Sequence, residues 1–238
     1  MIMEKPKIIV FDLFETLVHD IKFSFSDGIK YVYQNVLTKG TNKEDFLNHV
    51  NGYWKTIYDA RANDNSEVAF KDELLDLKHK YGFQTNASLF DIQCICVDKM
   101  NQIQLFKDTI PPLTFLQKSG IPFYLLSNAI FKKDVMTRYL SRFGLAPYFK
   151  ETFFSAGYSI RKPHPALFQT VYHSILTTSP EVTKNQILFV GDNYTADVLA
   201  SNAFGFTPVY LNRLHLPDTN TNHFLEISSL SELTRLIP

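Results

Sequence analysis

Short, β-branched apolar segments that end in polar or acidic residues recur along the chain, and they constrain its fold more than any other feature. The first is KIIVFD, which ends at Asp12. Segments of the same form follow at 121–128, 186–193 and 206–212, with weaker candidates at 151–156 and 223–227. Helical patterns lie between them at 111–120, 133–145, 164–176 and 194–205. Fully buried strands that alternate with helices are typical of an α/β fold, so we predict a parallel sheet with helices on both faces.

One region breaks this alternation. Residues 19–105 contain no convincing strand and read as four helices, at about 25–39, 42–63, 66–81 and 87–105. Gly40, the cluster Asn63-Asp64-Asn65 and Gly82 separate these helices. We therefore predict two domains: a core formed by residues 1–18 and 106–238, and a helical cap domain of residues 19–105. The cap would lie over the carboxyl ends of the strands.

Composition excludes several classes of partner. Lys+Arg and Asp+Glu are equal at 24 each, so no overall field attracts nucleic acid or an anionic membrane. The chain has no run of ~18 apolar residues and hence no predicted transmembrane helix. Cys94 and Cys96 are two positions apart, a spacing that does not favour a disulfide on a helix. We therefore predict a cytoplasmic protein that binds neither nucleic acid nor membrane, and the predicted cap suggests a small-molecule substrate, because its closure over the crevice would exclude large polymers.

Polar residues that follow the predicted strands carry the candidate chemistry. These residues are Asp12, Ser127, Asn128, Asp192 and Asp197, to which Lys162 in the segment IRKPHP is added. The carboxyl ends of parallel strands meet at one edge of a sheet, so these distant residues can converge. Carboxylates suit Mg²⁺, while a hydroxyl, an amide and a lysine suit an anion. Together they have the chemistry needed to transfer a phosphoryl group to an aspartate.

Four of these segments resemble, in order, the motifs of the haloacid dehalogenase-like (HAD) hydrolase superfamily. DLFET resembles the first motif, YLLSN the second, RKPHPALF the third and GDNYTAD the fourth. The helical region after the first motif is similar to the small α-helical cap of that superfamily. The resemblance covers nearly the whole chain. It implies a Rossmann-like core and chemistry in the crevice between core and cap.

The resemblance also implies a role for each matching residue. Asp12 would be the nucleophile, and Thr16 the fixed threonine of the same motif. Ser127 and Lys162 would bind substrate oxygens, with Asn128 beside them, and Lys162 would also steady the Asp12 carboxylate. The implied Mg²⁺ ligands are Asp12, the Phe14 backbone carbonyl and Asp192, with Asp197 as a ligand or close neighbour.

Phe14 departs from the family pattern. The phosphatases of the superfamily carry a second aspartate at this position, which protonates the leaving oxygen and later activates water. Proton transfer of this kind contributes ~10²–10⁴-fold to a rate, so a phosphatase without it should be slow. Phe14 still has a carbonyl for the metal. We expect the neighbouring Glu15 to face away from the site, because adjacent side chains of an extended segment point in different directions.

Three functions are therefore compatible with the sequence. The favoured one is a Mg²⁺-dependent phosphatase that acts on a small phosphorylated metabolite through an aspartyl-phosphate. A 2-haloacid dehalogenase, which also lacks the second aspartate, is the first alternative. Against it, the metal motif of Asp192 and Asp197 is intact, and no arginine occurs before Arg61 to take the halide, although lysines such as Lys22 or Lys30 lie there. The second alternative is a catalytically weak HAD-like protein that binds a ligand or a protein partner.

Overall fold

A six-stranded sheet forms the centre of the computed structural model, which describes residues 6–216 and 224–237. The strand order is β5-β4-β1-β6-β7-β8, and every neighbouring pair is parallel. The strands are β1 (Ile8–Phe11), β4 (Phe123–Ser127), β5 (Phe149–Phe154), β6 (Ile187–Gly191), β7 (Thr207–Leu211) and β8 (Leu225–Ile227). The predicted α/β fold is confirmed. The predicted last strand, 223–227, is found as β8 from Leu225, and its residue 223 lies outside the described residues.

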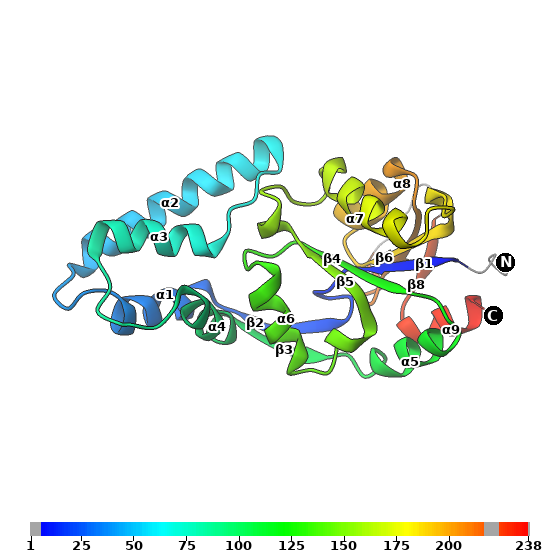
Figure 1. The fold of residues 1–238 in the computed structure, drawn as a ribbon, viewed down its shortest axis with the longest axis horizontal. Coiled ribbons are helices and arrows are strands. Elements are labelled where there is room, and N and C mark those ends of the chain that lie inside the picture. The colour runs from blue at the N-terminus through cyan, green and yellow to red at the C-terminus, as the bar shows by residue number, and fades with distance from the viewer. Residues whose placement is uncertain (1–5, 217–223, 238) are drawn as a thin grey trace.

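Helices cover both faces of this sheet (Figure 1). One face carries α7 (Pro165–Thr178) and α8 (Ala200–Phe204), and the other carries α5 (Ile110–Lys118), α6 (Lys133–Ser141) and α9 (Leu233–Leu236). In β1, Ile8 and Val10 pack on the α7 side while Ile9 and Phe11 pack on the α6 side. Because both faces of β1 are buried, the strand needs apolar side chains at every position rather than at alternate ones.

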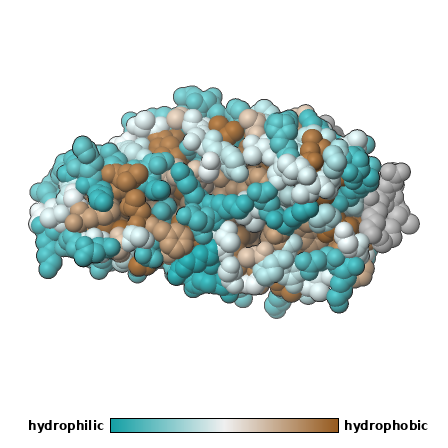
Figure 2. Space-filling view, in the orientation of Figure 1, coloured by the Kyte–Doolittle hydropathy of each residue, from teal (hydrophilic) through white to brown (hydrophobic). Residues whose placement is uncertain are grey.

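A helical region occupies residues 25–100, on the left of Figure 1. Its elements are α1 (Phe25–Tyr31), a π-helical turn (Val32–Val36), α2 (Lys43–Asp64), α3 (Phe70–Tyr81) and α4 (Leu89–Met100). Asn42 and Ser88 cap α2 and α4, since the side chain of each accepts a hydrogen bond from the backbone three residues later. Hydrophilic residues cover much of the outer face of this region, with a group of apolar residues among them (Figure 2). The division into core and cap domains stays a prediction.

Two strands flank this helical region and were not predicted from the sequence. The statement that residues 19–105 contain no strand is wrong: β2 (Val18–Phe23) and β3 (Asn101–Leu105) form an antiparallel pair. The helix predicted at 87–105 accordingly ends at Met100. In β2 only Val18 is buried, so the segment lacks the apolar run of a central strand. Its partner strand is also about eighty residues away, and the residue pattern of one segment alone does not show that it pairs with such a distant strand.

The remaining elements are short. They are 3₁₀ turns at Ala146–Tyr148, Ser155–Gly157, Lys184–Gln186 and Leu230–Glu232, and a π-helical turn at Tyr194–Leu199. Among the described residues, no helix combines the length and the apolar character needed to cross a membrane.

Candidate active site

The carboxyl ends of the central strands bring Asp12 and Lys162 into direct contact. Asp12 follows β1, and its backbone N–H donates to the carbonyl of Val190 on β6 at 2.9 Å. Lys162 Nζ lies 2.7 Å from Asp12 Oδ1 and 2.5 Å from Asp197 Oδ1. All three side chains are less than a tenth exposed. Residues 150 positions apart in sequence therefore form one buried charged cluster.

This cluster holds Lys162 in its charged form. Burial alone lowers the pKa of Lys162, but the charges of Asp12 and Asp197 and their hydrogen bonds outweigh burial, so that the pKa lies above the ordinary lysine value. The ammonium is thus a fixed positive charge beside the Asp12 carboxylate. Such a charge can orient that carboxylate and attract an anionic substrate.

Asp12, Asp192 and Asp197 form a possible metal site. Each offers one carboxylate oxygen, and the three oxygens lie within 4.8 Å of one another. Burial raises the pKa of Asp192, and the charges of Asp12 and Asp197 raise it further. Burial also raises the pKa of Asp197, although Lys162 partly offsets the effect. Carboxylates crowded in this way favour a cation between them, and hard oxygen donors suit Mg²⁺.

The backbone around Asp197 holds its carboxylate in place. Asn193 caps the π-helical turn, accepting from Ala196 N–H at 2.8 Å, and its own N–H donates to Asp197 Oδ2 at 3.1 Å. A Cβ at Gly191 would overlap the Asp197 carboxylate, so only glycine fits at the end of β6. The predicted helix start after Asn193 is confirmed, with a π-helical turn in place of the first α-turns.

Ser127 and Asn128 follow β4 and differ in their surroundings. Ser127 is buried, and its Oγ has no hydrogen-bond partner among the described residues. A buried hydroxyl without a partner is costly unless a ligand completes it. The Asn128 amide instead binds the backbone of Lys162, accepting from its N–H at 2.8 Å and donating to its carbonyl at 3.1 Å. Asn128 therefore positions Lys162, and its predicted contact with substrate stays a prediction.

Phe14 and Glu15 occupy the loop between β1 and β2. Phe14 is half-buried, and its side chain lines a cavity together with Asn128 and Arg161. Glu15 adopts a left-handed conformation with φ of 57°. One of its carboxylate oxygens lies 3.0 Å from His19 Nδ1, and the other accepts from Asp20 N–H at 2.8 Å. Both oxygens are thus engaged with β2, in agreement with the expectation that Glu15 faces away from Asp12.

Arg213 braces the same loop and was missed in the sequence analysis. It donates through Nη2 to the carbonyl of Thr16 at 2.9 Å and through Nη1 to both oxygens of Asp108 at 3.0 Å. The Thr16 hydroxyl in turn donates to Asp192 Oδ1 at 3.3 Å. The position of Arg213 two residues after β7, in the segment YLNR, is the only sequence signal for it.

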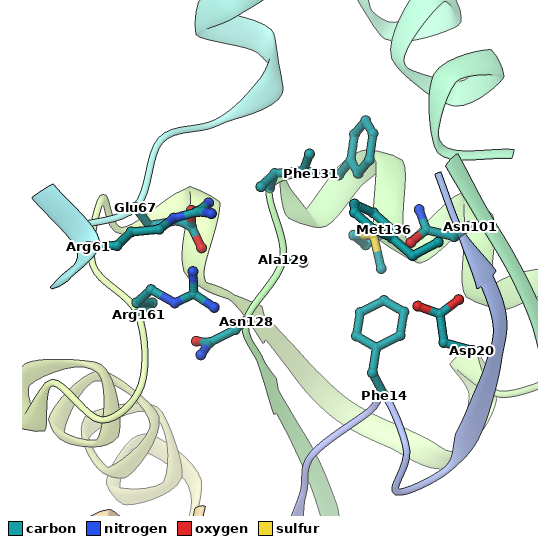
Figure 3. A pocket seen from close by; sticks show the side chains of 12 residues that line it. Phe14, Asp20, Arg61, Glu67, Asn101, Asn128, Ala129, Phe131, Met136 and Arg161 are labelled. Carbon is teal, nitrogen blue, oxygen red and sulfur yellow. The ribbon is translucent and has the colours of Figure 1, made fainter. Parts of the chain in front are cut away.

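A cavity of about 180 Å³ lies between the helical region and the loops that follow β1 and β4 (Figure 3). Three of its lining residues are neighbours of site residues in sequence: Phe14, Asn128 and Arg161. The other residues that line it are Asp20, Phe23, Arg61, Glu67, Asn101, Ala129, Ile130, Phe131 and Met136. The cavity thus offers room for a small ligand next to the loops that carry Asp12 and Lys162.

Comparison with known proteins agrees with this arrangement. The family model of the haloacid dehalogenase-like hydrolases matches residues 6–205. YfnB of Bacillus subtilis strain 168, described as a HAD-hydrolase, is 22% identical over 242 residues, which cover 99% of this chain and 97% of YfnB. The pyrimidine 5′-nucleotidase PynA of Streptococcus pneumoniae is 30% identical over 111 residues, which cover 46% of this chain and 44% of PynA.

Solved structures share the fold at low sequence identity. A HAD phosphatase from Thermococcus onnurineus matches with a TM-score of 0.64 and 20% identity, covering 97% of each chain. A 2-haloacid dehalogenase from Pseudomonas syringae matches with a TM-score of 0.65 and 17% identity, covering 98% of each. The magnesium-bound structure of YfnB matches with a TM-score of 0.59 and 20% identity, covering 98% of this chain and 99% of YfnB. Phosphatase and dehalogenase resemble the chain equally well.

Proposed function

The chain belongs to the haloacid dehalogenase-like hydrolases, and we propose that within this family it is a Mg²⁺-dependent phosphatase of small phosphate esters. The observation that carries the proposal is the buried group of Asp12, Asp192, Asp197 and Lys162. A nucleophilic carboxylate there lies next to a fixed cation and two further acids. The two acids favour a phosphatase, because a metal site is needed to neutralise a phosphate but not to displace a halide.

Asp12 attacks the phosphorus in the proposed reaction. Its carboxylate oxygen forms a bond to phosphorus, and the bond from phosphorus to the ester oxygen breaks, releasing the alcohol once that oxygen takes a proton. Water then cleaves the aspartyl-phosphate, which releases phosphate and restores Asp12. Lys162 holds the carboxylate in position and pairs with a phosphate oxygen, and the free hydroxyl of Ser127 donates to another.

The residues fit a Mg²⁺ ion at this place. Asp12, the Phe14 carbonyl and Asp192 would hold it, with Asp197 as a ligand or close neighbour, and the raised pKa values of Asp192 and Asp197 reflect charges that a cation would balance. When bound, the ion supplies positive charge that offsets the charge of the phosphate. The relative YfnB has been solved with magnesium, in accordance with this assignment.

Phe14 makes the proposed phosphatase slow. A phenyl ring cannot give a proton to the leaving oxygen or take one from water, and proton transfer is worth ~10²–10⁴-fold. Glu15 does not replace it, since its oxygens are engaged with His19 and Asp20. The alcohol would then leave with a proton from water, so esters of acidic alcohols should react fastest.

We place residues 19–105 in a cap domain, since β2 and β3 join the helical region to the core sheet at its two ends. A cap over the crevice excludes large polymers and favours a small substrate. The two cysteines, Cys94 and Cys96, are free and buried, in keeping with the reducing cytoplasm that we propose as the location.

A dehalogenase is the second candidate, and Phe14 is the observation in its favour. In that reaction Asp12 would displace halide from carbon to form an ester, which water would hydrolyse, so no proton need reach the leaving group. Asp192 and Asp197 count against a dehalogenase. In a metal-free reaction, two buried carboxylates beside Asp12 would add negative charge that no metal ion balances.

One pair of assays separates the candidates. Phosphate release from small phosphate esters and halide release from 2-haloacids are measured with Mg²⁺ and with a chelator. The proposal expects Mg²⁺-dependent phosphate release that is abolished in Asp12→Asn. Halide release that survives the chelator would establish the dehalogenase instead. No turnover of either, together with binding of Mg²⁺ and inorganic phosphate, would identify a binding protein.

A further inference from the structure

The cavity between the helical region and the loops that follow β1 and β4 is placed to hold the part of a substrate that is not transferred. Its lining residues Phe14, Asn128 and Arg161 each lie within two positions of Asp12, Ser127 or Lys162. Its volume of about 180 Å³ is close to that of a cavity of ~150 Å³ that accommodates benzene. A short carbon chain with one polar group fits such a space.

Positive charge is in excess at one end of the cavity. Figure 3 shows Arg61, Glu67 and Arg161 together at this end, from two different parts of the chain. Glu67 is buried and forms an ion pair with Arg61, and it also accepts from Ser155 Oγ at 2.8 Å and from Val68 N–H at 3.2 Å. The guanidinium groups of Arg61 and Arg161 thus lie near a single carboxylate, Glu67, whose oxygens already bind Arg61, Val68 N–H and Ser155 Oγ.

Arg161 is the guanidinium that lacks a partner. Its backbone N–H is bonded to the carbonyl of Asn65 at 2.9 Å, but its side chain makes no hydrogen bond or ion pair within the described residues. Burial lowers the pKa of Arg161, Glu67 offsets part of this effect, and Arg61 adds to it. A half-buried cation in these surroundings is stabilised by an anion, and the planar guanidinium matches a carboxylate with two parallel hydrogen bonds.

The opposite end of the cavity disfavours an anion. Asp20 lies there beside Phe14 (Figure 3), and its Oδ1 is buried without a hydrogen-bond partner in the part of the chain that the structure describes. Between the two ends the walls are mainly apolar, with Ile130, Phe131 and Met136 among them. An anionic substrate group therefore has one favourable position, next to Arg161.

We infer that the cavity takes the alcohol part of a phosphate ester that carries a carboxylate on a short carbon chain, and that Arg161 pairs with this carboxylate. The inference rests on the proposed phosphatase function and names its substrate class. A carboxylate is favoured over a second phosphate because a single negative charge balances the one guanidinium in excess at this end.

The test compares two esters of similar size, 2-phosphoglycolate and ethyl phosphate, of which only the first has a carboxylate. Their dissociation constants are measured by calorimetry on the full chain carrying Asp12→Asn, and kcat/KM is measured on the chain with Asp12 intact. A hydrogen-bonded ionic contact of this kind predicts a preference of about 10- to 100-fold for 2-phosphoglycolate. Arg161→Gln should remove about that preference, Arg161→Lys should keep part of it, and Arg235→Gln, at an exposed position on α9, should keep all of it.

Equal affinity for the two esters would overturn the inference, as would a preference that Arg161→Gln leaves intact in a protein with an unchanged circular dichroism spectrum. Tighter binding of ethane-1,2-diyl bisphosphate than of 2-phosphoglycolate would overturn the choice of a carboxylate. Failure of the proposed function gives a different result. Neither ester then releases phosphate in the presence of Mg²⁺, and the binding preference measured by calorimetry still tests whether Arg161 pairs with the carboxylate.

Discussion

The side chain of Asn128 forms two hydrogen bonds to the backbone of Lys162, one to its N–H and one to its carbonyl. This contact ties the loop after β4 to the segment before α7, 34 residues later. Lys162 reaches Asp12 from that segment, so the amide of Asn128 determines where the ammonium lies.

Asn128→Ala should therefore weaken catalysis without touching Asp12. The backbone N–H and carbonyl of Lys162 lose their partners, which costs about 1–3 kcal/mol for each group left unsatisfied. We expect a lower melting temperature and a kcat reduced by at least about tenfold, since a misplaced catalytic group commonly costs ~10²-fold. Asn202→Ala, at an exposed position on α8, is the control and should change neither quantity. A kcat equal to that of the unmodified chain would show that Lys162 is held by other contacts.

Phe14→Asp should speed the release of phosphate. The substitution places a carboxyl group where the loop after β1 meets the cavity, and general acid–base catalysis contributes ~10²–10⁴-fold when the group is well placed. We expect kcat to rise at least about tenfold for esters of weakly acidic alcohols, and less for aryl esters, whose leaving group needs no proton. Phe14→Asn is the matched control, with similar volume and no transferable proton. Equal rates for the two variants, both folded and both binding Mg²⁺, would refute our account of the missing acid.

Local patterns were sufficient to predict the sheet and its strand-end acids. Each central strand is buried on both faces, so its apolar run is visible in the sequence, and the parallel arrangement follows from the alternation with helices. The contact between Asp12 and Lys162 was expected from the family resemblance, because Lys162 lies between β5 and α7 and not at the end of a strand. The pair of β2 and β3 is not predicted, since neither strand has the continuous apolar run of a central strand and each is defined by its distant partner.

The features that sequence did not predict depend on contacts between separate segments. In the sequence, nothing distinguishes Arg161 from other arginines that neighbour a lysine. Its role becomes visible only in the structure, where Asn65 and Glu67 of the helical region lie beside it. Arg213 supports the Thr16 carbonyl from the far end of the chain. The two hydrogen bonds between the Asn128 amide and the backbone of Lys162 were likewise not predicted. In each case the partner is a backbone group or a charge brought in by tertiary structure, for which one sequence carries no pattern.

Mg²⁺ should stabilise the protein, and removal of Asp192 should have two opposite effects. Without metal, burial and neighbouring carboxylates raise the pKa of Asp192, which means that its charge destabilises the folded state. Asp192→Asn should therefore melt at a higher temperature than the unmodified chain in a chelator. With Mg²⁺ at a hundredfold excess over Kd, the unmodified chain should gain about 2.7 kcal/mol, or roughly 5 to 10 °C, and Asp192→Asn should gain little.

Differential scanning calorimetry with and without Mg²⁺ measures both effects. Asp59→Asn, in α2 and outside the acid cluster, is the control and should respond to Mg²⁺ like the unmodified chain. If Mg²⁺ stabilises Asp192→Asn as much as the unmodified chain, Asp192 is not a metal ligand. If Asp192→Asn melts at a lower temperature than the unmodified chain in the chelator, the carboxylates do not repel one another as we describe.

Glu73 should make the stability of the helical region fall as pH rises. Its side chain is buried in α3, one oxygen accepts from Trp54 Nε1 at 2.9 Å, and the other has no partner among the described residues. Burial raises the pKa of Glu73 from 4.5 to about 8, although the hydrogen bond from Trp54 opposes the shift. Between these two values the unfolded chain has lost a proton that the folded chain keeps. Unfolding then releases a proton, so the free energy of unfolding decreases by up to about 1.4 kcal/mol per pH unit and levels off above the folded-state pKa.

The single tryptophan of the chain makes this loss measurable, because Trp54 contacts Glu73 directly. Denaturant unfolding followed by tryptophan fluorescence gives the free energy of unfolding at each pH across the window from 4.5 to about 8. Glu73→Gln keeps an acceptor for the indole but has no proton to lose, so its unfolding free energy should depend less on pH and exceed that of the unmodified chain at the alkaline end. Glu44→Gln, exposed in the first turn of α2, should keep the original slope. If Glu73→Gln has the same slope as the unmodified chain, Glu73 is ionised in the folded protein and its surroundings are more polar than the burial of its side chain indicates.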